Sequence, residues 1–389
     1  MNDLNQTAGV FRDPTRPLHT KGGSPGYLEN SLAAAAEPLT GITTDGKVVP
    51  GLFSIEKTGV STRPIKEAAE AFLASLKPEQ RAKTVFPVDT PEWRKWSNIH
   101  PTLMRHGMPL FEMSDTQRDR AFALLRESLS AEGFQIARDV MRLNETVLEM
   151  TGRRAEYGED LYWLSIMGTP SAGDPWGWQI DGHHLNVSYF VLGDQVVMTP
   201  AFLGSEPVHA TTGRYAGTRV FKADEDRGLA MIRALSSEQR AKAIIAAESK
   251  GEVLTAAFRD NLVLDYAGIR YDELASAQHE PLLHLIQLHI GRMRRDHAEV
   301  KMAEVKRHLR ETYFCWMGGI EDDSVFYYRL QSPVVIIEFD HQRGIAFRQY
   351  TKPYKDHIHI VVRTPNGNDY GKDLLRQHYE RSHHYGGGV

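Results

Sequence analysis

The chain has 389 residues, 41% hydrophobic and 25% charged, a composition typical of a soluble globular protein rather than a disordered or membrane protein. Its net charge of −4 and pI near 6.5 argue against a nucleic-acid or anionic-membrane partner. No run approaches the roughly 18 apolar residues of a membrane span, and the N-terminus lacks the apolar core of an export signal, so we expect a soluble, cytoplasmic protein.

Residues 1–62 are rich in Gly, Pro, Thr and Ser and show little periodicity, which predicts an extended N-terminal arm. An arm of this length also favours a homo-oligomer. We expect a single large domain over residues 63–382 and a flexible tail over 383–389. Apolar side chains at helical spacing predict helices over 65–76, 114–150 with a break near Gly133, 223–248 and 281–311.

Strands are predicted over 160–170 and as a hairpin joined at Gly193 and Asp194, followed by four short strands after residue 312. Because the strands follow one another rather than alternate with helices, we predict an α+β fold with a mainly antiparallel sheet and flanking helices. No phosphate-binding glycine loop or serine-hydrolase elbow occurs, so the sequence does not support a nucleotide cofactor or a serine nucleophile.

The strongest chemical signal is the pair His357 and His359. Strand side chains alternate, so both imidazoles should point to one face, a geometry that suits two ligands of one Zn or Fe ion. Glu338 and Asp340 end the preceding strand and also share a face. Glu338 is therefore a candidate metal ligand and Asp340 a candidate general base; the alternative is that both carboxylates pair with arginines.

A second cluster, between residues 176 and 204, contains adjacent histidines. On a regular strand His183 and His184 would point to opposite faces, so we expect only one of them to complete the metal site. Trp176 and Trp178 are candidate walls of a substrate pocket, with core packing as the alternative. Asn186 is a candidate substrate-binding residue on the face of His184.

Polar residues crowd the turn after the second histidine pair. Arg363 is a candidate anion clamp for a substrate carboxylate or phosphate. Asp369 is a candidate for orienting a ligating histidine, although aspartate also builds turns with no other purpose.

The two clusters resemble the domain-of-unknown-function family 3500, which has bacterial and fungal members. The resemblance rests on WGWQIDGHHLNVSY, TPAFLGSEP, YYRLQSP, IEFD, HIHIVVRTPNGNDYG and LLRQHY, and it covers roughly residues 65–380. It implies that both histidine clusters and the two carboxylates belong to one domain. It implies no activity, and exported relatives weaken the expectation of a cytoplasmic location.

These patterns predict a metal-dependent enzyme, most simply a hydrolase that uses a metal-activated water on a small polar or anionic substrate. The expected cofactor is a divalent transition metal, Zn or Fe. One alternative is a non-haem iron oxygenase with two histidines and one carboxylate. Another is a non-catalytic carbohydrate- or ligand-binding protein that stacks its ligand on the tryptophans.

Overall fold

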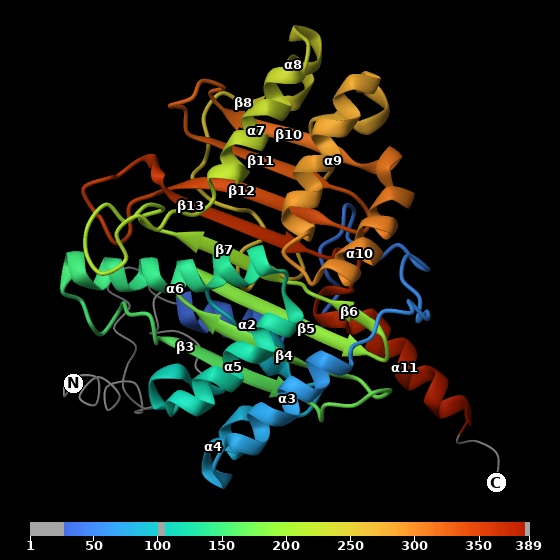
Figure 1. Ribbon diagram of the computed structural model, residues 1–389. Helices are drawn as coiled ribbons and strands as arrows, with labels where there is room; N and C mark the ends of the chain where they lie inside the picture. Colours follow the sequence, from blue (N-terminus) through green and yellow to red (C-terminus); the bar gives the residue numbers. More distant parts are fainter. Residues whose placement is uncertain (1–26, 100–105, 386–389) are drawn as a thin grey trace.

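The computed structural model describes residues 27–99 and 106–385, which form one large sheet with helices across it (Figure 1). Across the sheet the strands are β1 (Val85–Phe86), β3 (Tyr162–Met167), β4 (Trp176–Gly182), β5 (Leu185–Leu192), β7 (Ala201–Ser205), β13 (Pro353–Arg363), β12 (Ile336–Arg343), β11 (Phe326–Gln331), β10 (Tyr313–Gly318) and β8 (Ile244–Ala246). Short strands β2 (Met108–Pro109), β6 (Gln195–Val197) and β9 (Ile269–Arg270) pair with β3, β5 and β10.

The sheet is mixed rather than purely antiparallel. β1 runs parallel to β3 and β8 runs parallel to β10, whereas the pairings along the middle of the sheet are antiparallel. The predicted hairpin joined at Gly193 and Asp194 is present as β5 and β6. The order of strands along the chain therefore predicted the middle of the sheet but not the parallel strands at its two edges.

Helices fill the intervals between strands. They are α2 (Tyr27–Ala36), α3 (Arg63–Ser75), α4 (Pro78–Thr84), α5 (Asp115–Ser128), α6 (Ala131–Thr151), α7 (Lys222–Ala234), α8 (Ser237–Ala243), α9 (Ser276–Ile290), α10 (Arg295–Arg307) and α11 (Lys372–Tyr385). Short 3₁₀ turns are η1 (Pro91–Arg94), η2 (Leu110–Glu112), η3 (Tyr271–Glu273), η4 (Leu309–Glu311) and η5 (Asp369–Gly371). No described helix has the length and apolarity needed to cross a membrane.

The predicted helix over 114–150 breaks at Ser130, three residues before the expected Gly133. The Ser130 hydroxyl accepts a hydrogen bond from the Gly133 backbone N–H at 3.0 Å and so starts α6. Gly133 lies inside the first turn, where an added Cβ would be 2.2 Å from the Arg292 carbonyl oxygen. This glycine permits close packing rather than ending a helix.

The two faces of the sheet have different coverings. Helices α3, α5 and α6 lie over the β3–β5 half and α7, α9 and α10 over the other half of the same face (Figure 1). The opposite face contacts connecting segments: the Thr255 carbonyl accepts a hydrogen bond from Arg363, and the Trp96 ring lies 6.0 Å from that of Phe202. Both faces are therefore packed, and the second face has polar side chains such as Arg363 among its aromatic residues.

The ends of the chain bear on the predicted domain limits. Residues 1–26 of the predicted arm lie outside the described residues. The rest of the arm includes α2 and a segment whose Ile42 carbonyl accepts a hydrogen bond from the Asn366 backbone N–H at 2.9 Å. At the other end α11 continues to Tyr385, into the predicted tail, and residues 386–389 lie outside the described part.

Candidate metal centre

Three buried histidines meet at one end of the middle strands. The Nε2 atom of His357 lies 3.2 Å from that of His184 and 3.1 Å from that of His359. Two imidazole nitrogens bound to one zinc ion at about 2.0–2.1 Å are themselves roughly 2.8–3.4 Å apart, depending on the coordination angle. The three side chains thus present their ring nitrogens at the spacing of ligands to a single metal ion.

The two histidines of β13 share a face, as the alternation of a strand predicts. His357 also makes a 2.7 Å hydrogen bond from Nδ1 to the Arg343 carbonyl oxygen. Because a carbonyl only accepts, Nδ1 of His357 carries the proton and Nε2 has a free lone pair. Hydrogen bonding of this kind commonly orients metal-binding histidines.

His184 reaches the site from a turn, not from a strand. His183 and His184 are the two residues between β4 and β5, and His184 has a φ of 62°. A non-glycine residue in this left-handed region costs roughly 1–2 kcal/mol, and such conformations concentrate at functional sites. The prediction that the two histidines point to opposite faces of a regular strand was therefore wrong, because the chain turns there.

His183 has a different environment from its neighbour. Its ring stacks on the His184 ring with centroids 3.9 Å apart, and its Nδ1 lies 2.8 Å from the Asn144 Oδ1 of α6. It lies outside the group of three converging nitrogens. His183 therefore supports the ring of His184 by stacking and is not one of the three candidate metal ligands.

Gly204 makes room for the three rings. It lies directly opposite His359 across the β7–β13 pairing. A Cβ added there would be 2.8 Å from His359 Cδ2 and 3.0 Å from His184 Cδ2. Only glycine at this position lets both imidazoles approach from their separate elements.

Burial keeps the cluster uncharged. It lowers the pKa of all three histidines, and the neighbouring imidazoles add to the lowering for His184 and His359. A neutral imidazole is the form that binds metal. The two residues are only 5% (His184) and 8% (His359) exposed, so only small molecules can reach the cluster.

Glu206 is a buried carboxylate beside the cluster that the sequence did not single out. One of its oxygens lies 3.6 Å from Nδ1 of His357. The carboxylate also accepts hydrogen bonds from the backbone N–H groups of Ile345, Ala346 and Phe347 and from the Tyr354 hydroxyl. Its position in the motif TPAFLGSEP is the one signal that could have drawn attention to it.

The two predicted carboxylates of β12 lie apart from the converging nitrogens. Glu338 accepts hydrogen bonds from the backbone of Leu254 and Thr255 and from the Tyr327 hydroxyl, which occupies both its oxygens. The prediction that Glu338 is a metal ligand was therefore wrong, because its carboxylate binds the connecting segment at Leu254 and Thr255. No carboxylate of the described residues joins the three histidines as a fourth ligand.

Asp340, the predicted general base, lies on the strand next to that of His359. It lies opposite His359 across the β12–β13 pairing, so the two side chains share a face. Its carboxyl group accepts hydrogen bonds from the Ser249 hydroxyl and the Gln342 side-chain amide, both at 2.8 Å. Burial, and secondarily the negative charge of Glu338, raises the pKa of Asp340 well above its usual range.

Arg363 and Asp369 form a structural network away from the cluster. Arg363 donates to the carboxylates of Asp369 and Asp260 and to the Thr255 carbonyl, so each of its nitrogens has a protein partner. It is fully buried and lies four residues beyond His359, roughly 13 Å along the strand. The predictions that Arg363 clamps an anion and that Asp369 orients a histidine were both wrong, because these two side chains pair with each other.

The aromatic residues predicted to line a pocket are core residues. Trp176 and Trp178 have no solvent exposure, and the Trp178 ring stacks on Tyr189 with centroids 5.3 Å apart. Their indole N–H groups donate to the Ser171 carbonyl and the Ser128 hydroxyl. Asn186, the predicted substrate-binding residue, is also buried, and its Oδ1 has no hydrogen-bond partner within the described ranges.

Comparison with known proteins gives a family but no activity. The family described as "Protein of unknown function (DUF3500)" matches residues 58–372, a span that contains all three converging histidines. No curated protein matches the chain, and no solved structure does.

Proposed function

The chain belongs to the DUF3500 family of proteins of unknown function, and we propose that it is a metal-dependent hydrolase of a small polar substrate. The convergence of the Nε2 atoms of His184, His357 and His359 at 3.1–3.2 Å carries this proposal. Catalytic zinc sites typically have three protein ligands and leave a further position for water or substrate.

The metal supplies one element of the chemistry: a bound divalent ion lowers the pKa of water toward about 7 and polarises a substrate carbonyl. The three histidines would hold the ion, and their burial keeps each imidazole neutral, so that one ring nitrogen of each has a lone pair for the metal. Asp340 is the proposed proton acceptor, because it faces the cluster from the adjacent strand and its raised pKa makes it a stronger base.

The three histidines and the burial of the tryptophans weaken the two alternative functions. An iron oxygenase with two histidines and one carboxylate requires a carboxylate ligand, whereas the converging group is three histidines. A carbohydrate-binding protein requires accessible tryptophans, whereas Trp176 and Trp178 are fully buried. Because the histidines have little exposure to solvent, the site favours a small substrate over a polymer.

Metal analysis of purified protein, followed by zinc titration of chelator-treated protein, tests the proposal. We expect one zinc per chain, loss of zinc binding in His359→Ala, and unchanged binding in His284→Ala, whose side chain is 59% exposed. Hydrolysis of small aryl esters should require zinc and fall about a hundredfold or more in Asp340→Asn while the zinc content stays the same. Zinc binding that survives His359→Ala rejects the site, and stoichiometric iron with oxygen consumption rejects the hydrolase.

A further inference from the structure

A separate cavity of about 280 Å³ lies on the opposite face of the same strands. Leu203 and Ile360 line it, and each immediately precedes or follows a residue of the histidine site, Gly204 and His359. Adjacent strand residues point to opposite faces, so the sheet separates the cavity from the histidines. The cavity belongs to a site that the proposed hydrolysis does not use.

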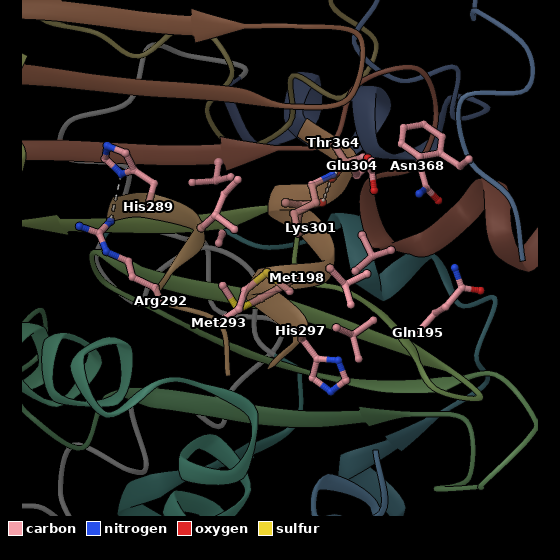
Figure 2. A pocket seen from close by; sticks show the side chains of 18 of the residues that line it. Gln195, Met198, His289, Arg292, Met293, His297, Lys301, Glu304, Thr364 and Asn368 are labelled. Atoms are coloured by element: carbon pink, nitrogen blue, oxygen red, sulfur yellow. Dashed lines mark hydrogen bonds and ion pairs between the residues drawn. The ribbon is translucent and has the colours of Figure 1, made fainter. Parts of the chain in front are cut away.

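Most of the cavity wall is apolar. Strand residues such as Val187 and Ile360 form its floor, and Ile290 and Met293 cover it from the end of α9 and the connection that follows. Figure 2 shows Arg292 and His289 at one side, Gln195 and Asn368 at the other, and methionines between them. An apolar space with a few polar groups at its ends is the usual form of a small-molecule site.

Arg292 brings an unsatisfied donor to this wall. Its terminal nitrogens contact Asp224 and Nδ1 of His289, but its Nε has no hydrogen-bond partner among the described residues although the side chain is buried. An arginine nitrogen can only donate, and a buried donor without a partner typically costs about 1–3 kcal/mol. A ligand oxygen is the natural acceptor for it.

His297 supplies a second unsatisfied atom. Its Nε2 has no hydrogen-bond partner in the described part of the chain, and the residue is only 2% exposed. Burial lowers the pKa of His297 to about 4, so the ring is neutral at physiological pH. The cavity therefore contains two buried polar side chains with unmet hydrogen-bonding capacity, contributed by neighbouring positions of the chain.

The charges of the two buried or half-buried cations of the lining are already balanced. Arg292 is paired with Asp224, and the Lys301 ammonium is bonded to Glu304 at 2.9 Å. An anionic group that accepted from Arg292 would lie beside the Asp224 carboxylate, and the remaining cation of the lining, Arg307, is the exposed last residue of α10. The Arg292 end of the lining therefore favours an uncharged ligand group over a carboxylate or phosphate.

We propose that this cavity binds a small, uncharged, mainly apolar molecule with a carbonyl oxygen that accepts a hydrogen bond from Arg292. A dry apolar cavity of about 150 Å³ accommodates benzene, so this one takes roughly ten non-hydrogen atoms. The proposal is independent of the metal site, because it rests on different side chains on the other face of the sheet.

Three probes of matched size test it by calorimetry: acetophenone, which has a carbonyl; cumene, which has none; and benzoate, which is charged. We expect acetophenone to bind at least about tenfold more tightly than cumene, since it alone satisfies the Arg292 donor, and benzoate to bind more weakly than acetophenone. Equal binding of acetophenone and cumene, preferential binding of benzoate, or no binding of any probe overturns the proposal.

Two kinds of variant assign the binding to this cavity. Arg292→Lys retains a cation for Asp224 but removes the Nε donor, so the preference for acetophenone over cumene should disappear while cumene affinity stays. Val362→Phe and, independently, Ala137→Leu fill the cavity from two sides and should abolish binding of both probes. Undiminished acetophenone binding in a folded cavity-filling variant would place the probe elsewhere and reject the site.

Discussion

Gly204 and the two imidazoles that flank it set the geometry of the candidate metal centre. A single methyl group at Gly204 would meet both His359 and His184 closer than carbon atoms normally approach. The ligand rings are thus positioned as much by the missing side chain on β7 as by their own backbones.

We predict that Gly204→Ala lowers zinc affinity by about tenfold to a hundredfold, because the methyl group displaces the ligand rings. Competition with a chromophoric chelator measures this change. Gly173→Ala is the matched control, since an added Cβ there has nothing within 4 Å. Wild-type affinity in Gly204→Ala would show that the rings bind metal in a different arrangement.

Some of this geometry was open to prediction from the residue sequence and some was not. The shared face of His357 and His359 follows from the period of a strand alone. The order of the strands suggested that the strand of Asp340 lies beside that of His359, but the register that puts these two residues opposite each other came from the structure. Glu206 and Gly204 could not be found in this way, because their roles depend on which strand lies beside β13.

At the scale of elements, the β4–β5 turn decides which of the two adjacent histidines joins the candidate metal centre. The sequence suggested a strand through both residues, whereas His184 adopts a left-handed conformation that rotates its ring toward β13. Strand periodicity does not apply within a turn, so the choice between the two histidines needed the backbone conformation.

We therefore predict opposite outcomes for the two histidines of this turn. His184→Ala should lose stoichiometric zinc, since it removes one of three ligands. His183→Phe should retain one zinc per chain with an affinity lowered by about tenfold, because phenylalanine keeps the stacked ring but loses the bond to Asn144. Elemental analysis and zinc titration distinguish the cases, and loss of zinc in both variants would make His183 a ligand.

At the scale of the whole molecule, Arg363 ties together segments that are distant in sequence. Through Asp260 it connects β13 with Arg94, which in turn donates to the carbonyls of Ala34 and Glu37. The charge balance of this network is local, with two aspartates around two arginines.

We predict that Arg363→Met lowers the free energy of unfolding by about 3–5 kcal/mol, because it leaves Asp260 and Asp369 buried without their partner. Zinc affinity of the folded variant should not change. Chemical denaturation and zinc titration test both statements, with Arg376→Met as the control for an exposed ion pair, expected to cost less than about 1 kcal/mol. A stable variant with impaired zinc binding would show that Arg363 belongs to the functional site after all.

Buried neutral histidines should also give the molecule a pH-dependent stability. Burial lowers the pKa of His289 to about 3 and that of His297 to about 4, below the ordinary value near 6.5 of the unfolded chain. As the pH falls from about 6.5 toward 4, the unfolded chain takes up protons that the folded protein does not, so stability declines.

Each such histidine contributes up to about 1.4 kcal/mol of lost stability per pH unit in this window. We predict that His297→Leu, which removes one of them, shows a smaller decline between pH 6.5 and pH 5 than the wild type. Denaturant titrations at three pH values measure the difference. Parallel declines for the two proteins would mean that His297 is protonated in the folded state.

His184 and His357 are separated by 173 positions in sequence, although their nitrogens lie 3.2 Å apart. The complete ligand set therefore exists only after β5, β7 and β13 have assembled, and the unfolded chain has no equivalent high-affinity arrangement. A metal that binds the native state alone stabilises it by mass action, by about 2.7 kcal/mol at a hundredfold excess over its dissociation constant. If the centre binds metal as proposed, metal supply would set the folded fraction of the protein as well as the proposed hydrolase activity.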